Sequence, residues 1–323
     1  MKAFFGDGLL LNSPAAETLY REVADLPIID YHCHLNEKEI RDGHKFANLG
    51  ELWLGGDHYK WRAMRLCGVE EFYITGGADH YAKYLKYAEI FPQLCGNPLY
   101  YWTQLELKLL FGITEPFCAE SAPRIWAAAN EQLGRMTVND LLRQFRVEYV
   151  ATTDDPASPL EAHGVYGGTE VRPTFRPDRM LSCAPDALRE LGEAAGVHVE
   201  TLDDMKEALR RRLTFFRSKG CRIADHGMDF LPLPDCGEVR AAELFARREA
   251  LTPHEAAELN AHLTAYLAGL YAGEGMVMQL HFGTFRNVNA AAFPQVGRDA
   301  GYDVMRSVVN TDALVDFFNT LEG

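Results

Sequence analysis

Two histidines, His32 and His34, stand one residue apart in the stretch LPIIDYHCHL, directly after a short apolar run. Residues two apart in a β-strand face the same side, so the two imidazoles would lie roughly 6.6 Å apart along one face. That spacing suits the binding of one divalent metal ion by both rings, with Asp30 on the same face. The alternative is a structural hydrogen bond for one histidine and solvation for the other. A position at the end of the first strand of a barrel would favour the metal site.

Residues that can do acid-base chemistry follow two later apolar runs. Asp225 and His226 place a carboxylate beside an imidazole in GCRIADHGMD, and His281 ends MVMQLH. Asp225 could instead be an exposed helix cap. His281 could be a metal ligand, a general acid or base, or a histidine packed in the core. The nearby Gly283 permits a close turn and Arg286 could hold an anion, which favours a site role for His281.

Two further segments combine charge with aromatic groups. Arg176 lies in FRPD at the end of a third apolar run, where the alternative is a surface salt bridge of little energetic value. The segment DHYKWR, residues 57–62, contains His58 and Tyr59. A solvated loop would rarely contain both a tyrosine and a tryptophan, although a helix buried through its aromatic face would. Both segments are therefore candidates for the site.

The composition indicates an acidic protein of the size of an enzyme. The 323 residues are 47% hydrophobic and carry a formal net charge of −14 at pH 7. This charge would repel nucleic acid and anionic membranes, so we expect a small-molecule partner, and an anionic one would need local arginines. The 7 cysteines are odd in number and include no CxxC pair, which is typical of reduced cytosolic thiols. Because a signal pattern and a run of about eighteen apolar residues are lacking, we expect a cytoplasmic protein without a membrane span.

These candidate residues need a scaffold, and helices alternate with short apolar strands along the chain. Helix starts are marked by Thr137, Thr201 and Thr252, each followed three residues later by an acidic residue. The first of these helices leads into a strand, the second stops at Gly220, and the third precedes another strand. Helices that alternate with strands imply parallel pairing through right-handed crossovers.

About five strands are expected, and each ends in residues capable of catalysis. They span residues 28–34, 147–152, 170–175, 221–225 and 276–281. This pattern predicts an α/β fold of the (β/α)8 TIM-barrel type, in which active sites gather at the carboxyl ends of the strands. A doubly wound open sheet is the alternative, but no GxGxxG follows the first strand, which disfavours a nucleotide-binding version.

The expected organisation has three parts. Residues 1–34 form an N-terminal segment with the first barrel strand, residues 35–146 a helical insertion, and residues 147–323 strands two to five with their helices. The insertion is too long for one crossover helix, and its amphipathic, aromatic-rich stretches at 79–91 and 98–111 indicate helices. We expect this insertion to lie as a lid over the barrel mouth.

The motifs IIDYHCHL, DHYKWR, YVATTDDP, FRPD, GCRIADHGMD and MQLHFGTFRN occur in this order and together closely resemble uronate isomerase, the glucuronate isomerase of the amidohydrolase superfamily. The resemblance covers essentially the whole chain. It implies a barrel of the metal-dependent hydrolase type that interconverts D-glucuronate with D-fructuronate, and D-galacturonate with D-tagaturonate. Such an aldose-ketose isomerase takes a proton from C2 and stabilises a cis-enediol, which requires a base, a proton relay and a Lewis acid. Arginines suit the substrate carboxylate.

The resemblance also implies roles at positions of this sequence. One divalent metal ion is expected, with zinc as the first choice, although the sequence leaves its identity open. The implied residues are, for the metal, His32 and His34; for catalysis, His58, Tyr59, Asp225 and His281; and for substrate binding, Arg176 and Arg286. The expected partner is a hexuronate, with neither nucleic acid nor membrane, and a homo-oligomer is left open.

One feature of the family's barrel is not matched. That barrel has eight strands, and its last strand delivers an aspartate that completes the metal site and is the expected proton-abstracting group. This sequence stops at Gly323, in or just after the helix that follows the fifth strand. We therefore expect a truncated chain that binds metal weakly and turns over poorly. Two alternatives remain open: a metal-dependent hydrolase of the same superfamily, and a non-catalytic fragment that folds only with a partner chain.

Overall fold

Parallel strands form the centre of the molecule, which a computed structural model describes at residues 6, 8–229, 232–306 and 311–321. The strands nearest the candidate residues are β1 (Ile28–Asp30), β2 (Val147–Ala151), β3 (Gly164–Tyr166), β4 (Thr169–Arg172), β5 (Ile223–Met228) and β6 (Val277–Phe282). Within the described ranges, one sheet has the order β1-β2-β4-β3 and a second consists of β5 and β6. β1, β2 and β4 pair in parallel, as do β5 and β6, whereas β3 is antiparallel to β4.

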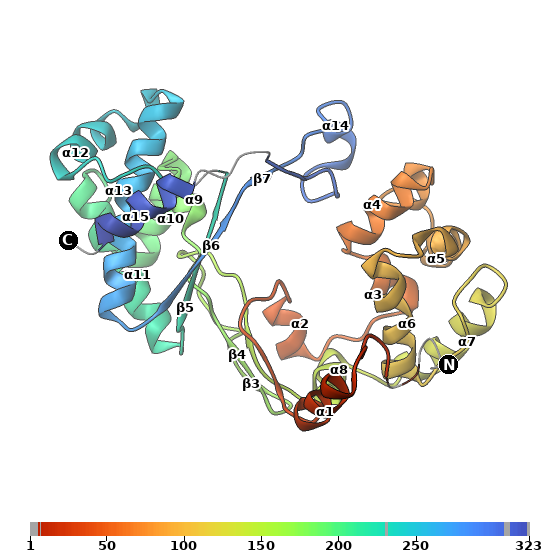
Figure 1. Ribbon diagram of the computed structural model, residues 1–323. Helices are drawn as coiled ribbons and strands as arrows, with labels where there is room; N and C mark the ends of the chain where they lie inside the picture. Colours follow the sequence, from red (N-terminus) through yellow and green to blue (C-terminus); the bar gives the residue numbers. More distant parts are fainter. Residues whose placement is uncertain (1–5, 7, 230–231, 307–310, 322–323) are drawn as a thin grey trace.

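Phe175 joins these two sheets. Its backbone N–H donates to the carbonyl of Ile223 at 3.1 Å, and its own carbonyl accepts from the N–H of Asp225 at 3.0 Å. Isolated parallel bridges also link Phe175 to Asp154 and to Ala224. The parallel strands therefore follow one another in chain order, so that their carboxyl ends lie along one edge. Figure 1 shows this layer of strands between two groups of helices.

One group of helices alternates with the later strands. Its helices are α9 (Asp178–Leu181), α10 (Pro185–Ala195), α11 (Leu202–Ser218), α12 (Glu238–Ala246), the 3-10 helix η3 (Arg248–Ala250), α13 (Pro253–Gly273) and α15 (Thr311–Leu321). Capping boxes at Thr201 and Thr252 begin α11 and α13, as the sequence predicts. The buried rings of Phe175, Phe216 and Tyr271 belong to the core of this group. Truncation of such an aromatic side chain to alanine costs about 3–5 kcal/mol, so this core fixes the position of β5.

The second group of helices lies between β1 and β2 in the sequence. It consists of α2 (Glu37–Asp42), α3 (Leu49–Leu54), α4 (His58–Leu66), η1 (Glu71–Tyr73), α5 (His80–Ile90), η2 (Phe91–Leu94), α6 (Pro98–Phe111), α7 (Ala122–Leu133) and α8 (Val138–Gln144). A separate core of aliphatic side chains and aromatic rings, among them Trp53, Tyr84 and Phe117, holds most of this group together. Thr137 forms the capping box that begins α8, as the sequence predicts.

The structure differs from the sequence-based expectation in the length of the first strand. The expected strand over residues 28–34 ends at Asp30. The carboxylate of Asp30 accepts a hydrogen bond from the backbone N–H of His32 at 3.4 Å, a local bond that competes with the strand ladder. His32 and His34 therefore lie on an extended loop after β1 rather than on the strand itself.

The β3–β4 hairpin and a second hairpin were not expected from the sequence. Gly167 and Gly168 both have positive φ and make the tight turn between β3 and β4, so this glycine pair was the available signal. The second hairpin pairs β7 (Thr284–Phe285) with β8 (Val304–Met305) and encloses α14 (Phe293–Val296). It carries the chain away from β6 towards α4 (Figure 1).

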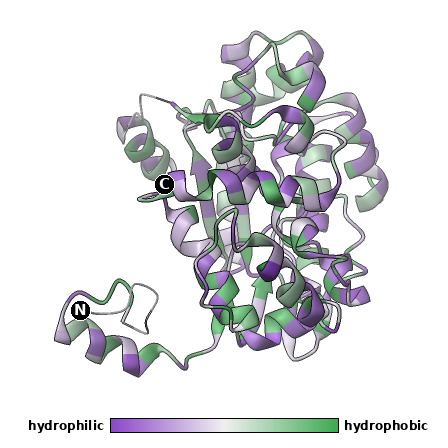
Figure 2. Cartoon of the chain, turned by 90° about the vertical axis from the view of Figure 1, so that its right-hand side faces the viewer, coloured by the Kyte–Doolittle hydropathy of each residue, from purple (hydrophilic) through white to green (hydrophobic). Residues whose placement is uncertain are grey.

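The two outer strands of the parallel series leave apolar side chains exposed. Ile29 of β1 is 63% exposed and Val277 of β6 is 60% exposed. Helix α1 (Pro14–Val23) stands away from the body, at the lower left of Figure 2, and buries none of its residues. No helix in the described ranges is both long and apolar enough to span a membrane.

Candidate metal and active site

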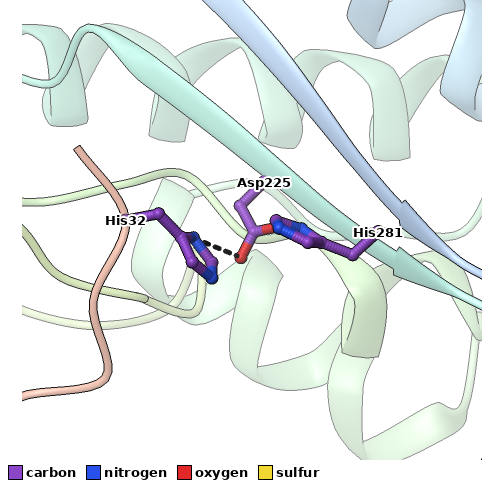
Figure 3. Close-up of side chains that lie close together, drawn as sticks. All are labelled: His32, Asp225 and His281. Carbon is purple, nitrogen blue, oxygen red and sulfur yellow. Dashed lines mark hydrogen bonds and ion pairs between the residues drawn. The ribbon is translucent and has the colours of Figure 1, made fainter. Parts of the chain in front are cut away.

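Three side chains converge on one point (Figure 3): His32 from the loop after β1, Asp225 from β5 and His281 from β6. One ligand atom from each lies within 4.8 Å of the others. The rings of His32 and His281 stack with their centroids 4.4 Å apart, and Nδ1 of His281 is hydrogen-bonded to Oδ1 of Asp225. β5 and β6 are parallel neighbours in which Asp225 pairs with Gln279, so His281 lies on the adjacent strand two residues beyond the partner of Asp225. The cluster therefore follows directly from the strand order.

An unpartnered nitrogen indicates that this cluster can hold a metal ion. Nδ1 of His32 is buried and has no hydrogen-bond partner within the described part of the chain, and Oδ2 of Asp225 lies 3.7 Å away. A buried polar atom without a partner costs free energy unless a ligand or water meets it. Two imidazoles and a carboxylate are donors that zinc and similar divalent ions accept. The donor set thus fits one divalent metal ion.

The electrostatic surroundings favour the neutral, metal-binding form of His32. Burial lowers the pKa of His32; the Asp225 carboxylate opposes this shift, whereas His281 and Arg176 add to it. Burial also lowers the pKa of His34, and the neighbouring His32 adds to that shift. Neutral imidazole is the form that coordinates a metal ion, so both shifts favour binding near neutral pH.

Arg176 bonds Oδ2 of Asp225, the same carboxylate oxygen that lies nearest to His32. Nη1 of Arg176 lies 3.0 Å from Oδ2 of Asp225, and its Nε lies 2.8 Å from Oδ2 of Asp178. Asp178 in turn accepts the backbone N–H of Gly227 with its two carboxylate oxygens, at 3.0 and 2.9 Å. Burial opposes the charge of Arg176, but its bonds to Asp178 and Asp225 raise its pKa overall. Arg176 therefore stays charged and orients both carboxylates.

His34 lies beside this cluster but outside the three-residue set. Its ring centroid is 5.0 Å from that of His32, with the rings nearly perpendicular, and its Nδ1 lies 3.4 Å from Oγ1 of Thr153. The two histidines thus remain neighbours although they are not on a strand.

A cavity of about 1110 Å³ opens over the cluster. The cavity is lined by six of the candidate residues predicted from the sequence: His32, His34, His58, Arg176, His281 and Arg286. Asp225 lies fully buried beneath them. Tyr59 does not line the cavity; it is largely exposed, and its ring stacks on that of His58 with a centroid separation of 4.6 Å. The cavity is large enough for a monosaccharide and presents imidazoles and arginines to it.

Two walls of the cavity come from elements outside the strand layer. His58 is the first residue of α4, whose N-terminal N–H groups are capped by Asp57. Arg286 follows β7, and its Nη1 lies 2.8 Å from Oδ2 of Asp303. The site is therefore assembled from the strand ends, the insertion and the β7–β8 hairpin.

His226 belongs to the core rather than to this cavity. Alternate residues of a strand point to opposite sides, so the side chain of His226 points away from that of Asp225 and bonds the hydroxyl of Tyr271 at 3.1 Å. Burial lowers the pKa of His226 to about 4.

Several residues of this neighbourhood were not predicted from the sequence. Among them, Thr153, Asn287 and Arg298 line the cavity, and Asp178 holds Arg176. The available signal for Asp178 was its place two residues after Arg176 in FRPD.

Comparisons with known proteins agree along the whole chain. Residues 1–323 match the family model described as glucuronate isomerase. The chain is similar to the uronate isomerase of Shouchella clausii, with 44% identity over 336 residues that cover 99% of this chain and 71% of that protein. It is 42% identical to the uronate isomerase of Caldicellulosiruptor saccharolyticus over 335 residues, which cover 100% of this chain and 72% of that protein. The crystal structure of the uronate isomerase from Thermotoga maritima matches with a TM-score of 0.94 at 34% identity, covering 98% of this chain and 73% of that one.

Proposed function

The chain belongs to the glucuronate isomerase family, and we propose that its cavity binds a hexuronate beside a divalent metal ion held by His32, Asp225 and His281. Membership in this family makes it an isomerase that interconverts D-glucuronate and D-fructuronate. The observation that carries the metal centre is the unpartnered Nδ1 of His32 next to a fully buried carboxylate. The alternative of a hydrolase is not favoured by these relatives.

Zinc is the metal that we propose, with His34 as a further ligand. Two or three imidazoles with one carboxylate suit zinc, and His34, whose ring centroid lies 5.0 Å from that of His32, would supply the third imidazole. When bound, the ion would polarise the sugar oxygens at C1 and C2 as a Lewis acid. Asp225 and His281, for which the resemblance implies catalytic roles, act here as ligands whose orientation Arg176 and the neighbouring strands fix.

Arginines account for the binding of an acidic sugar by an acidic chain. Arg176 and Arg286 both line the cavity, and a guanidinium can hold a carboxylate through two parallel N–H bonds. Arg176 already bonds the carboxylates of Asp178 and Asp225, whereas Arg286 is half exposed at the wall. We therefore assign the substrate carboxylate to Arg286.

Proton transfer between the two sugar oxygens is assigned to the insertion. His58 reaches the cavity from the start of α4, and the Tyr59 ring stacks on it. An imidazole can accept and return a proton near neutral pH, which is what the passage from aldose to ketose through a cis-enediol requires. The same geometry supports a lid role for residues 35–146, because the insertion supplies a wall of the cavity. The same residues would bind and interconvert D-galacturonate and D-tagaturonate.

We infer more specifically that these parallel strands belong to a (β/α)8 barrel. Its support is the parallel chain order of the strands together with the exposed apolar side chains of Ile29 and Val277 on the outer strands. A closed barrel has no free strand edges, so additional strands beside β1 and β6 would cover these residues.

This function can be tested by measuring the turnover of D-glucuronate in the presence of defined metal ions. The metal-free chain, and the chain with zinc, manganese or magnesium, would be incubated with D-glucuronate, and fructuronate would be followed by NMR. We expect metal-dependent formation of fructuronate, with zinc binding at one ion per chain. Turnover that is unaffected by complete metal removal would contradict the metal centre. Hydrolysis of ester or amide substrates without any isomerisation would support the hydrolase instead.

A further inference from the structure

A short strap, residues 300–303, connects two walls of the cavity that are far apart in the sequence. On one side, Nε of Arg62 donates to the carbonyl of Gly301 at 2.9 Å, and its Nη2 donates to the carbonyl of Asp303 at 2.5 Å. Arg65, one turn further along α4, donates to the carbonyl of Ala300. The strap is thus attached to the helix that begins with His58.

The other side of the strap holds Arg286. Oδ2 of Asp303 lies 2.8 Å from Nη1 of Arg286, and Oδ1 accepts the backbone N–H of Asn287 at 2.8 Å. The side chain of Asp303 is 15% exposed, compared with 51% for Arg286. Asp303 therefore uses both carboxylate oxygens within the hairpin, on one nitrogen of the guanidinium and on the backbone beside it.

This arrangement leaves one edge of Arg286 open to a ligand. Within the described part of the chain, the ion pairs of Arg286, with Asp303 and with Asp299 at 3.9 Å, both run through Nη1. Nε and Nη2 form the edge with which a guanidinium binds a carboxylate through two parallel bonds. A carboxylate at Nη1 thus orients the guanidinium without occupying that edge.

Close packing fixes the strap against the start of α4. A Cβ added to Gly301 would lie 2.6 Å from the carbonyl oxygen of His58, so only glycine fits there. The ring of Tyr302 packs under the guanidinium of Arg65, 4.6 Å from centroid to Cζ. Figure 1 shows the β7–β8 hairpin, with α14, reaching across towards α4. The strap is consequently packed against the start of α4 at Gly301 and bonded to Arg286 through Asp303.

We propose that Asp303 is a positioning residue for substrate binding: it aims the free edge of Arg286 into the cavity and, through the strap, sets the distance of Arg286 from His58. This inference rests on the proposed function, because the ligand concerned is the carboxylate of a hexuronate. A purely structural role for Asp303 would be to close the hairpin, without any link to the ligand charge.

Two matched substitutions separate these roles. Asp303→Asn keeps an acceptor for the Asn287 N–H but removes the charge that holds Arg286. Asp25→Asn removes an exposed carboxylate that pairs with an arginine, Arg146, at the same distance of 2.8 Å, but neither of these two residues lines the cavity. D-glucuronate binding to the zinc-loaded chain would be measured by calorimetry, with zinc affinity measured separately. We expect about tenfold weaker glucuronate binding for Asp303→Asn, less than twofold change for Asp25→Asn, and unchanged zinc affinity for both.

A double-substitution cycle gives the decisive readout. If Asp303 acts through Arg286, Asp303→Asn should weaken glucuronate binding no further in an Arg286→Ala background. Independent, additive losses, or equal losses of zinc and glucuronate affinity, would overturn the inference and leave the isomerase assignment intact. A wild-type chain that binds zinc but neither glucuronate nor galacturonate would overturn the proposed function and this inference with it.

Discussion

The guanidinium of Arg176 lies 3.0 Å, from Nη1 to Oδ2, from Asp225, a carboxylate with no exposed surface. The same carboxylate bonds His281 and faces the unpartnered nitrogen of His32. A buried charge of this kind is stable only while its partners remain, and removal of one partner leaves an uncompensated charge. Asp225 therefore links the proposed metal centre to Arg176.

Asp225→Asn should strongly weaken zinc binding. The amide is a poorer metal ligand and no longer supplies a negative charge to the ion or to Arg176, so we expect zinc affinity to fall by at least about a hundredfold. Isothermal calorimetry with zinc, and the metal content after gel filtration, measure the effect. Asp155→Asn is the control, because Asp155 binds Arg179 at 2.9 Å on the surface nearby. One zinc per chain retained by Asp225→Asn would refute the assignment of this carboxylate as a ligand.

His32 and His34 should contribute unequally to metal affinity. His32 offers an unpartnered nitrogen within the cluster, whereas Nδ1 of His34 has Thr153 as a neighbour at 3.4 Å. We expect His32→Ala to weaken zinc binding about a hundredfold and His34→Ala about tenfold, in competition with a chromophoric chelator. Equal losses of zinc affinity in the two variants would instead support two equivalent histidine ligands, as the spacing in the sequence suggests.

Much of the site could be predicted because parallel strands bring their carboxyl ends together. The runs before Asp225 and His281 were recognisable strands, and their adjacency follows from chain order. The strand before His32 was predicted too long, since the local bond between Asp30 and the His32 backbone could not be read from apolar spacing.

Contacts between distant segments could not be predicted. Arg62 meets the carbonyls of Gly301 and Asp303 across more than 230 residues, and the periodicity of a single sequence carries no information about such pairs. The same limit applies to Asp178 and Gly227, which meet across 49 residues. Local patterns specified the elements, whereas tertiary packing selected which polar groups face each other.

Gly227→Ala should disturb Arg176 without disturbing the backbone conformation of β5. A Cβ at this position would lie 2.4 Å from Nη2 of Arg176 and 2.8 Å from Oδ2 of Asp178. We expect a loss of about 1–3 kcal/mol in the free energy of unfolding and weaker glucuronate binding, measured by urea denaturation and calorimetry. Gly269→Ala in α13 is the matched control, because its Cβ would meet nothing within 4 Å. That variant should gain about 0.5–1 kcal/mol; equal behaviour of both variants would contradict the crowding at Gly227.

Stability in acid should depend on His226. This fully buried imidazole has a pKa of about 4, lowered by burial from 6.5, and bonds the hydroxyl of Tyr271. In the unfolded chain, His226 therefore takes up a proton as the pH falls through 6.5. In the folded chain, it takes up this proton only near pH 4. The stabilisation from a neutral His226 is complete above pH 6.5 and is lost progressively below it, by about 3 kcal/mol at the lower limit.

His226→Gln retains a hydrogen-bonding group for Tyr271 but cannot titrate, so its free energy of unfolding should fall less steeply between pH 6.5 and 4. Urea denaturation of the metal-free protein across this range measures the difference, with His198→Gln at an exposed position as the control. Identical slopes for wild type and His226→Gln would show that this histidine is not held neutral by the fold.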